Sequence, residues 1–388
     1  MSSVVISGDT SGAVTISAPA VAGTTTLTLP ATSGTILQSG TTVTEAQGGT
    51  GTSTGYYGFK NRIINSAMVI DQRNAGASVT PTDAQYCVDR WRAVASAASK
   101  FTVQQSTTAP DGFTNSLLLT SSSAYTPLTS EAFGILQLIE GFNCADLMFG
   151  TATAKTITVS FWVRSSLTGT FGGFLTNASF NRAYPFTYTI NSANTFEQKT
   201  VTIAGDTTGT WATNSSGCIG VGFSIGAGAT LSATAGAWGA GTKLGATGQT
   251  QLISTNGATF YITGVQLEKG STATSFDYRP IGTELALCQR YFQLSRSAFG
   301  GGNTSVQALV NIAYRVTMRS TPDLGVQGAI SITDGTNDSV QSSGGITNIN
   351  SDSNAGMALL TNFTGLTVSR VYTMRLANSN AITLSAEL

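Results

Sequence analysis

Short segments in which apolar and polar residues alternate recur along this chain, and turn-forming residues separate them. Residues 12–17 (Gly-Ala-Val-Thr-Ile-Ser) and 155–164 (Lys-Thr-Ile-Thr-Val-Ser-Phe-Trp-Val-Arg) are two examples. Alternation places the apolar side chains on one face of a strand, whereas a helix requires a period of about 3.6 residues. Only 10% of the residues are charged and 44 are glycine, which suits strands joined by tight turns. We therefore expect an all-β fold.

Residues 1–45 contain three strand segments, at 12–17, 25–30 and 34–37. A piece this small, with no disulfide or metal, cannot bury enough apolar surface to fold alone. Strands from sister chains could supply the missing core and cover the exposed strand edges. The segment therefore predicts an intertwined homo-oligomer, without fixing the number of chains. We interpret residues 46–59, rich in Gly, Thr and Ser, as a linker or as an ordered loop packed on a neighbouring chain.

Residues 60–280 have the pattern of a jelly-roll-like β-sandwich, with many short strands and almost no helical periodicity. Further strands are expected at 198–203 and 259–267, and a long Gly-rich loop at 226–248. The stretch 132–140 is compatible with either a strand or a short helix. The clearest strand is the one at 155–164, with Ile157, Val159, Phe161 and Val163 on one face.

Residues 281–388 predict a C-terminal β-rich domain, into which residues 284–292 lead. The sequence Asp-Gly-Thr-Asn-Asp at 334–338 is a strong turn signal. Asp334, Asn337 and Asp338 could alternatively bind calcium, but the regular acidic spacing of a calcium loop is missing, which favours a plain hairpin turn. Two alternating strands are expected, one with Val306, Ala308, Val310, Ile312, Tyr314 and Val316 on a face, the other with Leu366, Val368, Tyr372, Met374 and Leu376, interrupted by Arg370.

The charge pattern limits the partners and the compartment. The formal net charge is +0 and basic residues do not cluster, so nucleic acid is not an expected partner. Before Lys60 the only side chains charged at neutral pH are Asp9 and Glu45, which gives no basic region of an export signal. The sequence contains no run of about 18 apolar residues, so membrane insertion is not expected. Synthesis and assembly in the cytoplasm are the simplest expectation.

The cysteines are far apart in the sequence and form no Cys-x-x-Cys pair. Zinc clusters are therefore not expected. In a reducing cytoplasm such thiols are usually small buried hydrophobes, and we prefer this interpretation to disulfide bonds. The residues concerned are Cys87, Cys144, Cys218 and Cys288.

The chain has no histidine, which excludes Ser-His and Cys-His nucleophiles and His-ligated metals. Paired carboxylates remain as possible catalytic groups, because glycoside cleavage needs only two acids. The acids that lie nearest to each other in the sequence are in turn-like or domain-edge contexts, where solvated or capping roles are commoner. We therefore expect no enzyme, no catalytic residue, no cofactor and no metal. The acids nearest in sequence are Asp83 with Asp89, Glu140 with Asp146, and Asp334 with Asp338.

Aromatic side chains could stack on sugar rings if exposed, although most are expected in the core. Trp238 lies in the stretch Ala-Gly-Ala-Trp-Gly at 235–239 and is the best candidate for a loop aromatic that contacts a glycan. The other aromatic residues that could stack on a sugar ring if exposed are Trp91, Trp162, Trp211, Tyr291, Tyr314 and Tyr372.

Several motifs between residues 60 and 292 occur in the order seen in one group of proteins. The chain resembles bacteriophage tail-fibre and virion structural proteins with a carbohydrate-binding-module-like sandwich. The weaker Thr-Leu-Pro segments of residues 1–45 also look like the attachment ends of such fibres. The motifs are Asn-Arg-Ile-Ile-Asn-Ser-Ala-Met-Val-Ile-Asp-Gln-Arg-Asn at 61–74, Val-Asp-Arg-Trp at 88–91, Ser-Phe-Trp-Val-Arg-Ser at 160–165, Phe-Tyr-Ile-Thr-Gly-Val-Gln-Leu-Glu-Lys-Gly at 260–270, Phe-Asp-Tyr-Arg-Pro at 276–280 and Cys-Gln-Arg-Tyr-Phe at 288–292.

The resemblance implies a homotrimeric fibre of the virion tail, assembled in the host cytoplasm. Residues 1–45 would be its attachment and trimerisation segment, bound to tail or baseplate proteins. The outer domains would bind a host-surface glycan or protein receptor, with residues 281–388 as a possible tip. The motif residues look like sandwich framework, so no binding site carries over. Two alternatives stay open, a polysaccharide-degrading tailspike and a head-borne decoration fibre.

Overall fold

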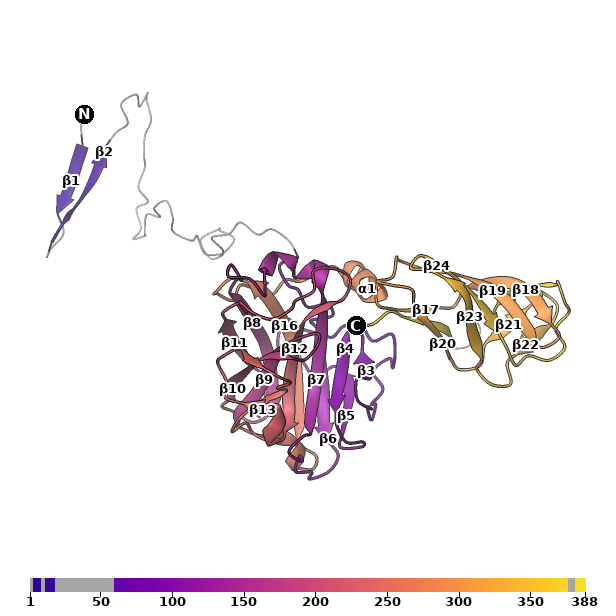
Figure 1. The fold of residues 1–388 in the computed structure, drawn as a ribbon, viewed down its shortest axis with the longest axis horizontal. Helices are drawn as coiled ribbons and strands as arrows, with labels where there is room; N and C mark the ends of the chain where they lie inside the picture. Colours follow the sequence, from indigo (N-terminus) through magenta and orange to yellow (C-terminus); the bar gives the residue numbers. More distant parts are fainter. Residues whose placement is uncertain (1–2, 8–10, 18–58, 376–380) are drawn as a thin grey trace. The chain divides into compact units, whose positions relative to one another are not determined.

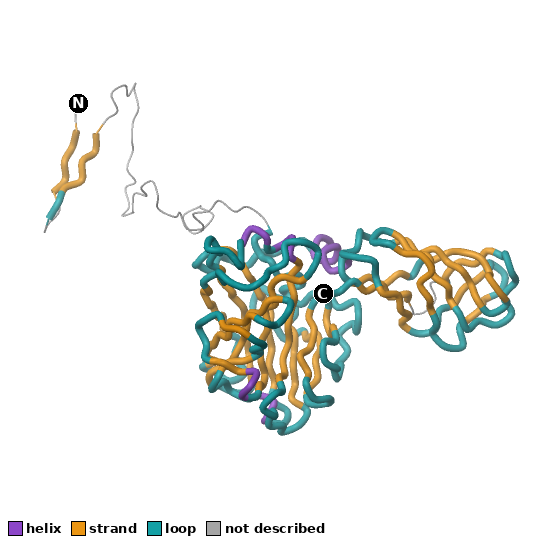
Figure 2. Tube along the Cα trace, in the orientation of Figure 1, coloured by secondary structure: helices purple, strands orange, loops and turns teal. Residues whose placement is uncertain are grey.

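The structure, a computed structural model, describes residues 3–7, 11–17, 59–375 and 381–388 and divides into two units, Met1–Tyr56 and Tyr57–Leu388. Among the described residues 44% lie in strands and 6% in helices, so the predicted all-β class is confirmed (Figures 1 and 2). No helix in these ranges is both long and apolar enough to span a bilayer.

The first unit contains one described hairpin. Strands β1 (Ser3–Ser7) and β2 (Ala13–Ser17) pair antiparallel, with Val4 opposite Ile16. Strand β2 coincides with the first expected segment. The expected strands at 25–30 and 34–37, and the linker at 46–59 except its last residue, lie outside the described residues. Intertwining with sister chains therefore stays a prediction.

The second unit begins with a β-sandwich of two antiparallel sheets (Figure 1), which confirms the predicted sandwich. One sheet has the order β14 (Gly239–Ala240), β10 (Arg182–Ile190), β9 (Gly169–Asn177), β12 (Gly217–Ala227), β7 (Ala132–Glu140), β4 (Trp91–Ala95), β3 (Tyr86–Val88). The other has the order β11 (Glu197–Ile203), β8 (Ile157–Ser165), β16 (Thr259–Lys269), β6 (Ser116–Ser121), β5 (Phe101–Ser106).

Short elements connect these strands. Strands β13 (Ser232–Ala233) and β15 (Gly245–Ala246) form a small parallel pair within the expected Gly-rich loop. The single-turn 3₁₀ helices are η2 (Gly141–Asn143), η3 (Ala145–Leu147), η4 (Ala229–Leu231) and η5 (Leu252–Ser254).

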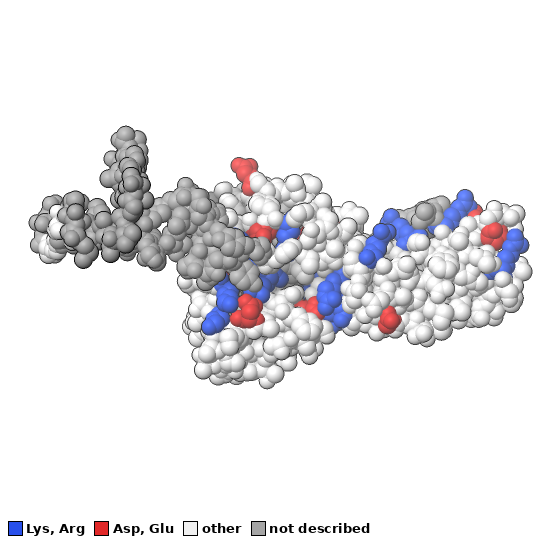
Figure 3. Space-filling view, turned by 90° about the horizontal axis from the view of Figure 1, so that it is seen from above, with Lys and Arg blue, Asp and Glu red and all other residues white. Residues whose placement is uncertain are grey.

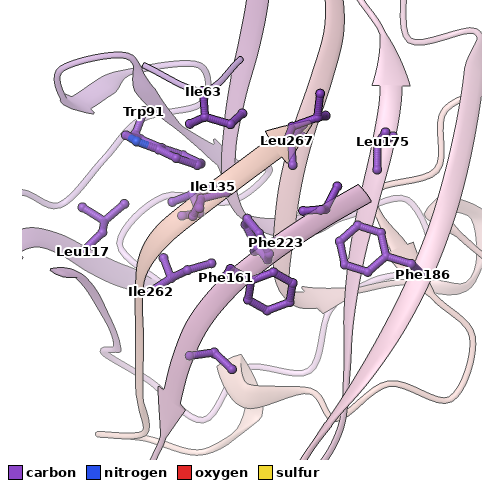
Figure 4. Packing of buried hydrophobic residues seen from close by; sticks show 14 of the residues in the cluster. Ile63, Trp91, Leu117, Ile135, Phe161, Leu175, Phe186, Phe223, Ile262 and Leu267 are labelled. Carbon is purple, nitrogen blue, oxygen red and sulfur yellow. The ribbon is translucent and has the colours of Figure 1, made fainter. Parts of the chain in front are cut away.

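The main core lies between the two sheets (Figure 4). Strand β8 contributes the apolar face expected from its alternation, and Phe161 within it is fully buried. The ambiguous stretch 132–140 is strand β7. Its side chains are apolar on both faces, because Ile135 packs into the main core while Leu136 joins a second cluster on the opposite face. This two-sided burial explains why the stretch does not alternate.

Helix α1 (Ile281–Gln289) follows the sandwich and leads into a second β-domain. Its sheets pack around a separate core that includes Val310, Ile332 and Leu384. One sheet has the order β17 (Phe292–Ser295), β26 (Ala381–Ser385), β20 (Asp323–Gln327). The other has the order β22 (Asp338–Val340), β21 (Ser331–Thr333), β25 (Val371–Met374), β18 (Ala298–Thr304), β19 (Gln307–Ala313), β24 (Ala355–Leu360), β23 (Ile346–Ser351).

The two strands expected in this domain are shorter than predicted. The first is β19, which begins after Val306, a residue that is 46% exposed. The second, β25, begins only at Val371, because Ser369 has a positive φ of 63° that turns the chain. Val368 consequently lies outside the strand and is 58% exposed. Leu376 lies outside the described residues.

Candidate functional site

Trp238, the predicted glycan contact, is half-buried at the edge of the main core. Its ring makes edge contacts with Phe149, Tyr184 and Trp211, at centroid distances of 5.8, 5.3 and 5.4 Å. Its Nε1 donates to the backbone carbonyl of Ala204 at 2.7 Å. The indole therefore closes the edge of the core, and its contact with a glycan stays a prediction.

Asp83 and Asp89 have structural partners. Asp83 accepts a hydrogen bond from the backbone N–H of Ala95 at 2.9 Å. The fully buried Asp89 accepts from the backbone N–H of Gln72 at 2.7 Å and from its Nε2 at 2.6 Å. Burial raises the pKa of Asp89 to about 6. Each carboxylate therefore fixes a nearby backbone segment by accepting its N–H hydrogen bond.

Glu140 and Asp146 are both ion-paired. Glu140 binds Arg290 in a bidentate pair at 2.9 and 2.6 Å and accepts the hydroxyl of Tyr291 at 2.6 Å. Burial opposes ionisation, but these hydrogen bonds hold the pKa of Glu140 below its ordinary value. Asp146 pairs with Arg62 at 2.8 Å and lies 3.4 Å from Lys269.

Asp334 and Asp338 lie at the hairpin between β21 and β22, so the predicted turn is confirmed. Asp334 accepts the backbone N–H groups of Thr336 and Asn337 at 2.8 and 2.7 Å, which lowers its pKa. Calcium binding there stays the less favoured alternative. Within the described ranges, no group of three or more His, Cys, Asp or Glu side chains is arranged to hold a metal ion.

All four cysteines are buried free thiols, as expected. Burial raises the pKa of Cys87 to about 12. The pKa of Cys144 is also raised, chiefly by a hydrogen bond with Cys218 and then by burial. The thiols of Cys87 and Cys144 are therefore poor nucleophiles at neutral pH.

Asn65 is the centre of a buried network built from the recognised motifs. Its side-chain amide donates to the carbonyls of Ile70 and Asp89 at 2.7 and 3.0 Å. Its own backbone carbonyl accepts from Trp91 Nε1 at 3.1 Å, and its backbone N–H donates to Glu284. Because Asn65 and Trp91 are fully buried and hydrogen-bonded, these contacts are those of a framework.

The outer face of the five-stranded sheet presents a different kind of surface. Since β8 turns Phe161 and Val163 into the core, Trp162 and Arg164 point outward from the same strand. The register places Arg164 opposite Tyr261 of β16, and Phe196 precedes β11 on the other side. We call these four half-buried residues, Trp162, Arg164, Phe196 and Tyr261, the Arg164 face.

Two aromatic rings lie near the guanidinium on this face. Arg164 Cζ lies 5.0 Å from the centroid of the Tyr261 ring and 5.9 Å from that of Phe196. The two rings meet edge to face, with centroids 6.2 Å apart. Such packing holds the cation in place by cation–π attraction. The Arg164 side chain as a whole is half-buried.

A strap formed by residues 270–279 covers the other end of the same sheet face. Gln266 Nε2 donates to the carbonyls of Thr274 and Ser275 at 3.4 and 3.2 Å, and Thr158 donates to Gly270 at 2.8 Å. The strap therefore covers Gln266 and Thr158 and leaves the Arg164 face uncovered at the other end of the sheet.

Two aromatic rings of the strap pack with Phe113. Phe113, Phe276 and Tyr278 lie with centroids 4.8 to 5.6 Å apart, and Tyr278 is 60% exposed. A Cβ on residue 264 would come within 2.7 Å of the Phe113 ring and 3.1 Å of the Trp162 ring. Glycine at this position therefore lets the Phe113 ring pack close to Trp162 of the Arg164 face.

The outer face of the seven-stranded sheet is instead covered by the chain itself. Phe174 and Leu136 are buried there under Leu244 and the partly buried Leu231. Both covering residues come from the Gly-rich loop. On the outer face of the five-stranded sheet two half-buried rings, Phe196 and Tyr261, lie beside one arginine, whereas on the seven-stranded sheet the half-buried Phe180 lies beside Arg92. In the view of Figure 3, charged side chains are sparse on the described surface.

Trp162 was one of seven aromatic residues considered from the sequence as sugar contacts, but Trp238 was preferred to it. The available signal was its outward position in the alternating strand 155–164. The contributions of Phe196 and Tyr261 needed the strand register, which no local pattern supplies.

No family model matches the sequence, and no curated protein matches it. The enzymatically active domain of tailspike protein 4 from bacteriophage CBA120 aligns with 54% of this chain and 22% of its own, at 13% identity and a TM-score of 0.28. A putative sugar binding protein from Bacteroides thetaiotaomicron aligns with 54% of this chain and 100% of its own, at 13% identity and a TM-score of 0.32.

The family 11 carbohydrate-binding module of a Clostridium thermocellum cellulase aligns with 52% of this chain and 99% of its own. Its identity is 10% and its TM-score 0.27. Structural similarity this low carries no conclusion about activity, since one architecture hosts many functions.

Proposed function

We propose that this chain is a non-enzymatic structural subunit of a bacteriophage particle. In this proposal it forms a homotrimeric tail fibre, assembled in the host cytoplasm, which anchors to the tail or baseplate through residues 1–45 and adsorbs to host-surface saccharides. The particle assignment rests on the sequence motifs of residues 60–292. The structure supports treating these motifs as one unit, because hydrogen bonds join Asn65 to both Trp91 and Glu284, which are distant from it in sequence.

The Arg164 face carries the saccharide-binding part of the proposal. Sugar rings offer apolar C–H faces that pack on aromatic side chains, and hydroxyls that bind polar groups beside them. Trp162 and Tyr261 supply rings on adjacent strands, and Arg164 supplies the donors between them. Because all three lie on strands, the surface is preorganised and loses little entropy on binding.

The contacts of the acids support a binding role over cleavage. Glycoside hydrolysis needs two carboxyl groups about 5 to 9.5 Å apart on either side of the scissile bond. Glu140 and Asp146 are instead held by arginines, and Asp83 and Asp89 by backbone donors. A polysaccharide-degrading tailspike would need another pair.

The test of saccharide binding uses the full chain on a panel of bacterial polysaccharides. We expect retention on at least one of them, and loss of that retention in Trp162→Ala and Tyr261→Ala. Trp238→Ala serves as the comparison, since the alternative site predicts that only this variant loses binding. Retention unchanged in the Trp162 and Tyr261 variants would refute the assignment of the face.

Two further measurements test the rest of the proposal. Immunogold labelling should place the chain at the tail of intact particles, and labelling of heads would favour the decoration-fibre alternative. Release of reducing sugar by the purified chain, abolished by changing one acid, would contradict the non-enzymatic assignment.

A further inference from the structure

Arg164 differs from most arginines of the described chain in having no carboxylate partner there. Its Nε is buried without a hydrogen-bond partner, and none of the ion pairs includes it. The arginines that do face a carboxylate are Arg62, Arg73, Arg90, Arg182, Arg279, Arg290, Arg370 and Arg375.

The outward neighbours of Arg164 on the sheet are uncharged. Tyr261 lies opposite it on β16, Trp162 lies two residues before it, and Gln198 of β11 lies opposite Trp162. Phe196 completes the surroundings with its ring. A cation is thus held between aromatic rings, half withdrawn from water and uncompensated by the protein. Such a charge favours an anionic ligand over a neutral one.

We propose that the Arg164 face binds an acidic saccharide, with the carboxylate of a uronic or sialic acid residue on the Arg164 guanidinium. The sugar ring would lie against Trp162 or Tyr261. This inference rests on the proposed saccharide binding and specifies its ligand class. A guanidinium presents two parallel N–H donors to a carboxylate, a geometry that a lysine does not reproduce.

The experiment measures affinities of the full chain for polygalacturonate, alginate, hyaluronate and polysialate. Dextran, galactan and methyl-esterified polygalacturonate are the neutral counterparts, and dextran sulfate reports unspecific attraction to a polyanion. We expect binding of at least one carboxylated polymer. Because a charge-assisted hydrogen bond is lost, Arg164→Gln should weaken it by about tenfold or more. Arg164→Lys should recover only part of this loss.

Arg92 gives a matched control. It also lacks an ion pair in the described chain, and its Cζ lies 5.4 Å from the centroid of the Phe180 ring, but its strand β4 belongs to the other sheet. Arg92→Gln should bind like the unchanged chain. Thermal unfolding of each variant verifies that the sandwich is folded.

The outcomes separate this inference from the function on which it rests. Equal binding of the esterified polymer, equal binding of dextran sulfate, or unaltered binding by Arg164→Gln would overturn the acidic specificity, while sensitivity to Trp162→Ala would leave saccharide binding intact. Absence of binding to every acidic and neutral polymer would overturn both.

Discussion

Arg90 and Glu387 form an ion pair between residues 297 positions apart in the sequence. Arg90 is only 1% exposed, and its Cζ lies 3.6 Å from the centroid of the Tyr291 ring. Glu387 also binds Arg73 at 2.7 Å, and Arg319 donates to its backbone carbonyl at 2.8 Å. The pair therefore ties the segment after β26, the last strand of the second β-domain, to the sandwich.

Loss of this pair should destabilise the sandwich strongly. Glu387→Gln leaves the buried Arg90 charge without its carboxylate, which costs about 3 to 5 kcal/mol in comparable cases. Denaturant unfolding of the full chain measures the change. Asp338→Asn is the control, because its pair with Arg375 is exposed and should contribute about 1 kcal/mol or less. Equal small effects from both variants would contradict the role given to Glu387.

Asp89 should make stability depend on pH. Its pKa is raised to about 6 by burial, above the ordinary value of 3.8, so between about pH 4 and 6 the folded state holds more protons than the unfolded state. Stability from this group is therefore greatest at low pH and falls as pH rises through that window. The loss is on the order of 3 kcal/mol.

The Asp89→Asn variant isolates this effect. We expect its free energy of unfolding to rise relative to the unchanged chain as pH increases from 4 to 7. Other acids oppose the trend, so the difference between the two proteins is the informative quantity. Asp111→Asn, at an exposed loop position, should show no such divergence. Parallel pH curves for Asp89→Asn and the unchanged chain would contradict the buried carboxylate.

Gly134 should tolerate no side chain. A Cβ there would lie 2.1 Å from the backbone carbonyl oxygen of Phe223 on the adjacent strand, and backbone cannot move aside cheaply. We expect Gly134→Ala to lower the melting temperature markedly or to prevent folding. Gly282→Ala, in helix α1 with nothing within 4 Å, should be neutral or stabilising by up to about 1 kcal/mol. Similar melting temperatures for both variants would be inconsistent with the strand packing.

The thiols should be unreactive in the folded chain. All four cysteines are buried, and the pKa of Cys87, for example, is raised to about 12. An aromatic disulfide reagent at neutral pH should therefore label none of them until denaturant is added, and then all of them. Rapid labelling of the native protein would show that this core opens readily.

Local pattern was sufficient to predict some elements of this fold. The strand 155–164 was predictable because its apolar residues alternate and face a single core. The strand expected near 366–376 was overextended, since the alternation begins before Ser369, where the chain turns ahead of β25. The strand expected near 306–316 was also too long, because β19 covers only Gln307–Ala313. The helix α1 was not predicted, because its apolar and polar residues show little segregation to opposite faces.

The candidate site could not be predicted from local sequence pattern. Trp238 stood out as an aromatic in a Gly-rich loop, but its ring packs on Trp211 and Phe149. The Arg164 face depends instead on cross-strand register and on the strap that covers the neighbouring sheet surface. Long-range pairings of this kind arise only when the sheet is assembled.

The structure of the full chain with a bound saccharide tests the central claim most directly. We predict sugar density over Trp162 and Tyr261, with an acidic group on the Arg164 guanidinium. Sugar bound beside Trp238 or on the second β-domain, with the Arg164 face empty, would contradict the account.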